Sequence, residues 1–173
     1  MANLVYSLLL LRLKNLPMTE NAINICLAQE HDVEDIYQLL LPSVDSEVIL
    51  PRSQENIRQY LANFLVARTE RSLAGTVALR DFDDGLHEIR SLAVASEYAG
   101  QGLGSRLVEK AVAMACQRQG KMVFTLTMRP NLFLRLGFKI VANDYFPQKV
   151  WADCRLCPKR EHCNEIALCK AIA

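Results

Sequence analysis

Apolar and polar residues alternate in several short stretches of the chain, with the two-residue period of a half-buried β-strand. The first stretch covers residues 23–28, where Ile23, Ile25 and Leu27 alternate with polar neighbours. Two more, 64–67 and 73–79, are separated by the polar run Thr69-Glu70-Arg71-Ser72, as in a hairpin. A turn-forming run of Asp and Gly then leads into residues 86–94. The middle of the chain therefore predicts an antiparallel meander.

Helical spacing of apolar residues appears between and after these strands. Asp32 stands at the N-cap position of a first helix, which we expect Pro42 to end. Ser53 is a candidate cap for a second helix. A long apolar stripe over 103–115 predicts a third helix, and a short one follows at 132–136. Each of the last two is followed by a glycine, which is a common helix stop.

The order of elements predicts an α/β (α+β) fold with a mixed, mostly antiparallel sheet and helices on both faces. Further strands are expected at 121–126 and 138–141. Beyond Pro147 the hydrophobic pattern breaks down, and no regular element is predicted there. We expect an N-terminal extension over 1–18, a main domain over 19–148, and a Cys-rich tail over 149–173 packed on that domain.

The N-terminal extension contains four consecutive leucines at 8–11. The run lacks the basic flank and the cleavage site of a signal peptide, and it is too short to cross a bilayer. The sequence therefore favours an upstream start, with Met18 opening the domain, or a short docked helix. It predicts a cytoplasmic protein without a membrane partner.

Charge and composition narrow the function further. The chain carries 20 basic and 19 acidic residues, a net charge of +1, so it has no electrostatic footprint for a nucleic-acid backbone. About half of the residues, 51%, are apolar, which is enough for a buried core. The sequence thus indicates a folded protein and disfavours nucleic-acid binding.

The strongest local signal is a glycine loop formed by Gly100, Gly102 and Gly104, between a predicted strand and a predicted helix. Glycines let a ligand approach the backbone, and the free N–H groups at a helix start attract an anion such as a phosphate. The loop follows an antiparallel meander rather than the first strand of a parallel unit. This placement disfavours a dinucleotide such as NAD.

Residues 88–94 (EIRSLAV) and 98–107 (YAGQGLGSRL) together resemble the acyl-CoA-binding motif of the GNAT N-acetyltransferases. The resemblance implies the GNAT fold, in which a bulge splays one central strand from its neighbour and the pantetheine arm of acetyl-CoA lies in the opening. It also implies the residues that bind this co-substrate: Leu92, Ala93, Val94, Gly100, Gln101, Gly102, Leu103, Gly104, Ser105 and Arg106. One departure is Ala99, where the family has Arg or Gln. Gln101 or Arg106 is then the candidate to supply the missing side chain.

The resemblance covers residues 22–167 and is closest to the short, single-domain N-acetylglutamate synthases. It is sharpest at 49–53, 124–129 and 133–138, and at 146–154 in the tail. It implies transfer of the acetyl group of acetyl-CoA to the α-amino group of L-glutamate, the first step of arginine biosynthesis.

Glutamate carries two carboxylates, so a site that selects it should present separate cationic groups, preferably arginines. Arg52, Arg90, Arg129 and Lys149 are the candidates, and Arg52 and Arg129 coincide with the family positions. These basic residues favour an anionic acceptor over a polyamine.

Direct transfer requires a base, because the acceptor's ammonium has no lone pair, and a donor for the developing oxyanion. The resemblance assigns Glu88 as the base, acting through a water, and the backbone N–H of Leu92 or Ala93 as the oxyanion donor. Phe133 stands where many relatives have a proton-donating Tyr. The departing thiolate is therefore protonated by a water or leaves unprotonated.

The tail holds Cys154, Cys157, Cys163 and Cys169, with His162 beside the third of these. The spacing leaves three interpretations open: a structural zinc site, reduced thiols, and a disulfide or redox pair. No metal is therefore assigned.

Two other functions fit the same residues. The first is a GNAT enzyme that acts on another amine, such as a protein N-terminus. The second is a non-catalytic acetyl-CoA-binding or redox-sensing module, suggested by Ala99, Phe133 and the cysteines. A homodimer is one expectation for the quaternary state.

Overall fold

The computed structural model describes residues 23–46, 48–147, 153–157 and 160–172. The predictions for the N-terminal extension, with its leucine run and the start at Met18, lie outside these residues. So does Lys149, one of the four predicted substrate ligands.

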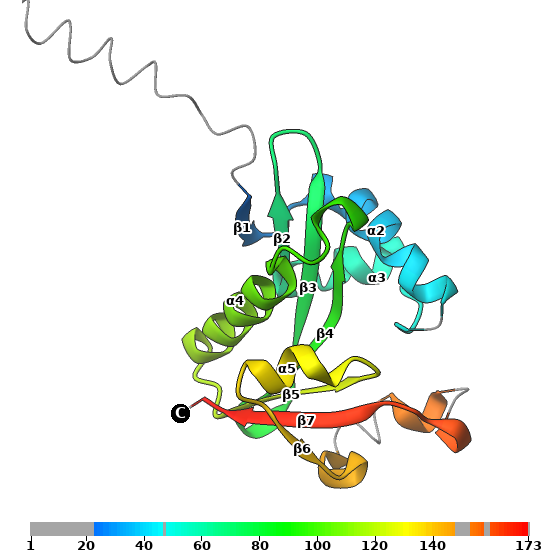
Figure 1. Cartoon of the computed structure of the whole chain (residues 1–173), viewed down its shortest axis with the longest axis vertical. Helices are drawn as coiled ribbons and strands as arrows, with labels where there is room; N and C mark the ends of the chain where they lie inside the picture. The colour runs from blue at the N-terminus through cyan, green and yellow to red at the C-terminus, as the bar shows by residue number, and fades with distance from the viewer. Residues whose placement is uncertain (1–22, 47, 148–152, 158–159, 173) are drawn as a thin grey trace, which may run out of the picture.

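One seven-stranded sheet forms the centre of the molecule (Figure 1). Its strands are β1 (Asn24–Leu27), β2 (Phe64–Arg68), β3 (Leu73–Asp81), β4 (Leu86–Val94), β5 (Met122–Thr127), β6 (Lys139–Val141) and β7 (Ile166–Ala171). They lie in the order β1-β2-β3-β4-β5-β7-β6. Only β4 and β5 pair in parallel, whereas the other neighbours are antiparallel. The predicted mixed, mostly antiparallel sheet is confirmed.

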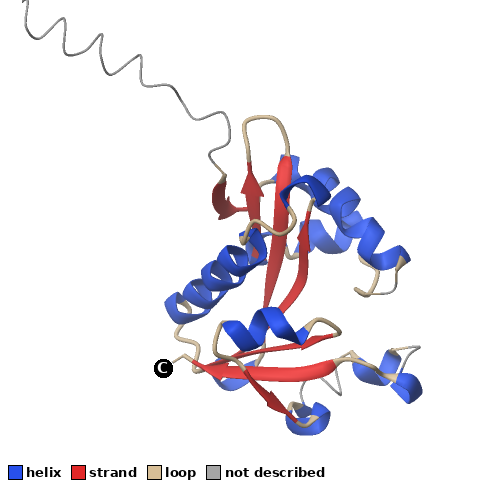
Figure 2. Ribbon diagram, viewed as in Figure 1, coloured by secondary structure: helices blue, strands red, loops and turns tan. Residues whose placement is uncertain are grey.

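Helices cover both faces of this sheet, as Figure 2 shows. They are α2 (Val33–Asp45), α3 (Gln54–Gln59), α4 (Leu103–Gln117) and α5 (Pro130–Arg135). Helix α4 buries Leu107, Val108 and Ala111 against one face, and Phe133 of α5 joins the same apolar cluster. Ile36 of α2 and Ile57 of α3 lie in a second cluster on the other face. No helix of the described residues is long and apolar enough to cross a bilayer.

Strand β4 is bulged and leaves its parallel neighbour part-way along. Ala78 of β3 faces Arg90, whereas Thr76 faces Ala93, so two residues of β4, Ser91 and Leu92, oppose one on β3. An inserted residue bends a strand and increases its twist. Pairing of β4 with β5 covers only three registers, from Leu86↔Met122 to Glu88↔Phe124. Beyond Glu88 the two strands diverge, which confirms the predicted splay.

Two local predictions are confirmed, and the predicted end of the first helix is wrong. Residues 86–94 form a strand with the predicted bounds, and the Ser53 hydroxyl caps α3 by accepting from the Asn56 amide at 3.2 Å. Pro42, however, does not end the first helix, which continues to Asp45. A proline removes one N–H from the helix, but its carbonyl still accepts, here from the Ser46 amide at 3.2 Å.

Asp32 occupies the predicted N-cap position of α2, but its carboxylate serves the segment before the helix. It accepts from the Gln29 amide at 2.7 Å and pairs with Arg68 on β2. The side chain is 2% exposed. It therefore ties the entrance of α2 to the sheet.

The prediction that no regular element follows Pro147 is wrong. Ile166–Ala171 forms β7, which lies between β5 and β6. Its sequence, IALCKA, is short and poor in β-branched residues, so the strand depends on pairing with both neighbours rather than on local preference. The tail thus supplies a strand of the main sheet.

Candidate active site

The glycine loop folds into a turn that opens at the start of α4. Gly100 and Gly102 have φ angles of +75° and +79°, in the left-handed region that glycine adopts without strain. Helix α4 begins at Leu103, and the Arg106 amide donates to Gly102 O at 3.2 Å. The amides of Leu103, Gly104 and Ser105 precede this bond, so they lack intrahelical acceptors and are available to an anion.

A groove of about 840 Å³ runs from this turn along the splayed end of β4 to the end of β5. Eight of the predicted co-substrate residues line it: Leu92, Ala93, Val94, Gly100, Gly102, Leu103, Gly104 and Ser105. Gln101 and Arg106 do not. The Gln101 side chain donates to Glu97 O at 2.9 Å, and Arg106 donates to Ile23 O at 3.1 Å. Both side chains thus bond to backbone carbonyls of the protein.

The turn has room for a ligand next to its backbone. A Cβ atom built on Gly100 or Gly102 would meet no heavy atom within 4 Å. At Gly104 it would lie 3.1 Å from Leu132 Cδ1, so a glycine here lets α4 begin close to α5. Open backbone donors beside a long groove fit a ligand that has a phosphorylated end and an extended arm.

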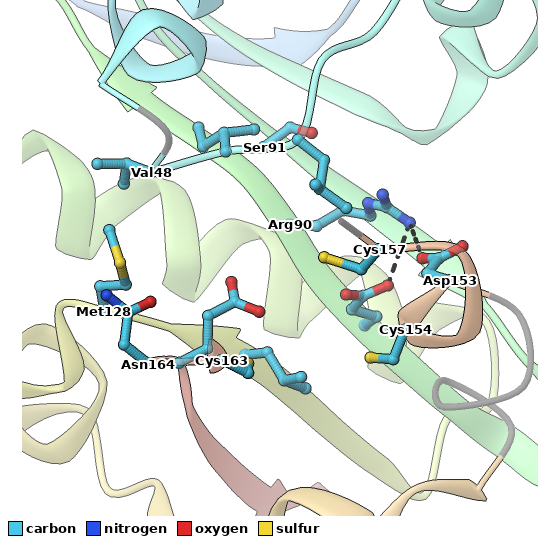
Figure 3. Close-up of a pocket in the computed structure, with 14 residues that line it drawn as sticks. Val48, Arg90, Ser91, Met128, Asp153, Cys154, Cys157, Cys163 and Asn164 are labelled. Atoms are coloured by element: carbon cyan, nitrogen blue, oxygen red, sulfur yellow. Dashed lines mark hydrogen bonds and ion pairs between the residues drawn. The ribbon is translucent and has the colours of Figure 1, made fainter. Parts of the chain in front are cut away.

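The Glu88 pocket, of about 100 Å³, lies beside this groove (Figure 3). Six residues line both spaces: Val48, Ile49, Arg90, Ser91, Leu126 and Met128. Glu88 is only 3% exposed, and its neighbours in the pocket include Asp153, Glu165 and three cysteines of the tail. A buried carboxylate thus lies at the point where β4 begins to leave β5.

An ion-pair chain runs through the wall of the Glu88 pocket. Arg80 Nη1 lies 2.7 Å from each carboxylate oxygen of Asp153. Arg90 Nη1 donates to Asp153 Oδ2 at 2.9 Å and to Glu88 Oε2 at 3.3 Å (Figure 3). The predicted substrate ligand Arg90 therefore binds two carboxylates of the protein itself.

Arg52 lines a third space, the Arg52 pocket, which shares Leu50, Arg90, Asp153 and Cys157 with the Glu88 pocket. Its Nε donates to Ser91 Oγ at 2.9 Å, and its Nη1 donates to Asn56 Oδ1 at 2.7 Å. Burial, and next the positive charge of Arg90, lower the pKa of Arg52 to about 10. The structure thus fixes this guanidinium beside the bulge of β4.

Arg129 and Phe133 lie in the groove itself. Arg129 follows β5, is exposed and lines the groove near Pro130. No side-chain hydrogen bond of Arg129 occurs within the described part of the chain, where only its amide bonds, to Thr127 Oγ1 at 3.0 Å. Phe133 also lines the groove, and it packs edge-on against Phe138 with ring centroids 5.3 Å apart.

Three cysteines of the tail, Cys154, Cys157 and Cys163, line the Glu88 pocket. Cys169 lies on β7 instead, and burial raises the pKa of its thiol. Among the described residues, no three His, Cys, Asp or Glu side chains are grouped so that they could hold a metal ion.

Comparison with known proteins identifies the family. Residues 61–140 match the acetyltransferase (GNAT) domain. An uncharacterized N-acetyltransferase of Chlorobaculum tepidum is 42% identical over 125 residues, which cover 72% of this chain and 81% of that protein. The chain belongs to the GNAT acetyltransferases. It is therefore an acetyl-CoA-dependent N-acetyltransferase, and the resemblance seen in its glycine loop is confirmed.

The names of two more distant relatives state a substrate or a product. An amino-acid acetyltransferase of Shewanella oneidensis is 29% identical over 134 residues, which are 76% of this chain but 30% of that protein. The N-acetylglutamate synthase of Neisseria gonorrhoeae, solved with coenzyme A and N-acetyl-glutamate, has a TM-score of 0.80 at 24% identity. The match covers 90% of this chain and 36% of that one. The GNAT chain thus spans about a third of the length of either relative.

A fold neighbour of similar length also exists. A Mycobacterium tuberculosis protein solved with CoA has a TM-score of 0.72 at 22% identity, and the match covers 87% of this chain and 99% of that one. At this identity the likeness shows the fold.

The sequence does not identify Arg80, Ser91 or Asp153 as site residues. Arg80 and Asp153 are 73 positions apart, and no local pattern indicates such a contact. Ser91 has a positive φ of +51°, which is uncommon for a residue other than glycine. The bulge that imposes this angle was implied by the resemblance, but the bond from Ser91 to Arg52 was not.

Proposed function

We propose that this GNAT enzyme transfers the acetyl group of acetyl-CoA to the α-amino group of L-glutamate. One observation supports the proposal best. The buried carboxylate of Glu88 lies in a pocket that adjoins the groove, while Arg52 lines the neighbouring Arg52 pocket and Arg129 lines the groove. This arrangement combines a proton acceptor with cations that suit an anionic amino acid.

The groove would hold the donor. The amides of Leu103, Gly104 and Ser105, with the turn at Gly100 and Gly102, would bind the pyrophosphate. Backbone groups of Leu92 and Val94, on the side of β4 that has left β5, would hold the pantetheine arm. When bound, acetyl-CoA supplies the thioester carbonyl that the acceptor amine attacks.

Glu88 would take the proton from the acceptor ammonium through a water. The carboxylate is buried, so few competing waters surround it, and the shared wall at Arg90 and Ser91 brings the pocket against the groove. The N–H of Leu92, in the bulge, or of Ala93, just after it, would donate to the developing oxyanion. No side-chain acid is assigned for the thiolate, because Phe133 has no proton to give.

Arg52 and Arg129 would bind the two acceptor carboxylates, with Lys149 as a further ligand from the tail. Arg52 is held by Ser91 and Asn56 through two of its nitrogens, so its remaining N–H groups are pre-oriented. Arg129 lines the groove from the end of β5. Arg90 is already bound to Glu88 and Asp153, so we assign it to the pocket rather than to the substrate.

Release of coenzyme A from acetyl-CoA, measured against the standard amino acids and a few polyamines, tests the proposal. We expect the highest kcat/KM with L-glutamate, a lower value with glutamine, which lacks the second charge, and none above background with polyamines. A preference for polyamines or for an uncharged amino acid would refute the glutamate assignment, while the family assignment would stand.

A further inference from the structure

Asp153 joins the C-terminal tail to the centre of the sheet. It immediately precedes the Cys154–Leu156 turn, and its carboxylate receives bonds from two strands, at 2.7 Å to both oxygens from Arg80 of β3 and at 2.9 Å from Arg90 of β4. Its side chain is 19% exposed. A carboxylate that is largely buried between two guanidiniums has strong, charge-assisted hydrogen bonds.

The same nitrogen atom of Arg90 connects Asp153 to Glu88. Arg90 Nη1 carries two hydrogens, and it lies 2.9 Å from Asp153 Oδ2 and 3.3 Å from Glu88 Oε2. Glu88 and Arg90 are two positions apart on β4, and Arg80 is the register partner of Glu88 on β3, so all three side chains share one face of the sheet. A change at Asp153 is therefore transmitted to Glu88 through a single guanidinium.

We propose that Asp153 is a positioning residue for the transfer reaction, one that holds Arg90 in place and offsets the positive charge around Glu88. The inference rests on the proposed role of Glu88 as the base. Two guanidiniums without a counter-charge would favour the carboxylate form of Glu88 and make it a weaker proton acceptor. Asp153 removes part of that effect while keeping Arg90 oriented.

The charge balance around Glu88 includes every element that borders the pocket. Arg80, Arg90 and Arg52 approach from β3, β4 and the segment before α3, and Asp153 and Glu165 approach from the tail. The titratable thiols of the same pocket are Cys154, Cys157 and Cys163. Asp153 accepts hydrogen bonds from two of these arginines, Arg80 and Arg90, so its removal should have the largest effect on Glu88.

An alternative role for the same carboxylate is to occupy the site of an acceptor carboxylate until the substrate displaces it. The two roles predict different kinetic effects when Asp153 is removed. A placeholder competes with glutamate, so its removal lowers KM for glutamate and leaves kcat unchanged. A positioning residue acts on the base, so its removal lowers kcat.

The test compares Asp153→Asn and Asp153→Glu with Asp144→Asn, an exposed residue elsewhere in the C-terminal region. We expect D153N to lower kcat for L-glutamate roughly 10-fold, as for a weakened general base. The acid limb of the pH profile of kcat/KM should move to lower pH. D153E, which restores the charge, should return the acid limb towards that of the wild type, and D144N should leave both quantities unchanged.

Calorimetric binding of acetyl-CoA and a thermal melt establish that each variant is folded. An unchanged kcat and acid limb in folded D153N, or a lowered KM with an unchanged kcat, would overturn the inference. Glu88→Gln, assayed alongside, distinguishes an error in the proposed base from an error in the proposed role of Asp153. If E88Q keeps full activity the proposed base is wrong, whereas if E88Q is inactive and D153N is unaffected only the role of Asp153 is wrong.

Discussion

Arg52 Nε donates a 2.9 Å hydrogen bond to Ser91 Oγ, which joins the segment before α3 to the bulge of β4. The bulge that opens the groove therefore also orients the guanidinium proposed to bind glutamate. Lysine keeps the charge of Arg52 but lacks the planar fork. We expect Arg52→Lys to raise KM for L-glutamate roughly 10-fold or more, with little change in KM for acetyl-CoA.

Arg58→Lys is the matched control for this measurement. Arg58 lies on α3, pairs with Glu30 and lines neither of the pockets nor the groove. Equal effects of R52K and R58K, or an unchanged KM for glutamate in R52K, would remove Arg52 from the acceptor site.

The lowered pKa of Arg52 gives a pH dependence. Burial and the charge of Arg90 bring this pKa to about 10, so the guanidinium is charged at neutral pH and loses its proton as the pH rises through that value. N-acetyl-L-glutamate has two carboxylates and no amine, so it isolates the anion site. Its affinity, measured by calorimetry, should be constant from pH 7 to 9 and should fall above about 10.

Acetyl-CoA is the control ligand, because its affinity should not follow the charge of Arg52. Deprotonation of Arg52 should not lower the free energy of unfolding. The folded state binds this proton less tightly than the unfolded chain does, so its loss removes the cost of a buried charge. Affinity for N-acetyl-L-glutamate that stays level through pH 10.5 would contradict the assignment.

Ser91 combines a backbone role and a side-chain role, which two substitutions separate. Ser91→Ala removes the hydroxyl that orients Arg52 and keeps a side chain at φ +51°, whereas Ser91→Gly also relieves this left-handed conformation. We expect both to raise KM for glutamate several-fold. S91G should be more stable than S91A by roughly 1 kcal/mol in chemical denaturation. Equal stabilities would show that the bulge imposes no strain at Ser91.

Gly120 is expected to tolerate no side chain, for a packing reason unrelated to the active site. A Cβ built there would lie 2.5 Å from His87 Cδ2 and 2.8 Å from Ala115 O. Gly120→Ala should therefore cost roughly 1–3 kcal/mol of unfolding free energy, as overpacking of a core does. At Gly100 the added methyl has open space, so Gly100→Ala should cost only the strain of its positive φ, about 1 kcal/mol. A G120A variant as stable as G100A would refute the predicted clash.

The sequence predicted the parts of the fold that depend on local pattern. The meander, the helix after the glycine turn and the cap at Ser53 follow from periodicity and from short-range hydrogen bonding. Strand β7 was missed because its stability comes from pairing with β5 and β6. Helix α2 passes Pro42 because a single missing N–H did not outweigh the packing of Ile36 and Leu40.

The residues of the candidate site also fall into two groups, those that a sequence motif predicted and those that only the structure shows. The groove residues from Leu92 to Ser105 are close in sequence, and a motif was enough to find most of them. Gln101 and Arg106 show the limit of a motif, because their side chains bond to Glu97 and Ile23. The chain from Arg80 through Asp153 to Glu88 joins segments that are far apart in sequence, and only the folded structure brings them together.

The most direct test of the account is kcat for acetyl transfer to L-glutamate in the wild-type enzyme and in Glu88→Gln, with acetyl-CoA affinity measured on the same preparations. We expect E88Q to lose roughly 100-fold or more in kcat near neutral pH, to lose the acid limb of the pH profile and to bind acetyl-CoA as the wild type does. A variant with wild-type kcat and an unaltered acid limb would show that the buried carboxylate of β4 is not the base.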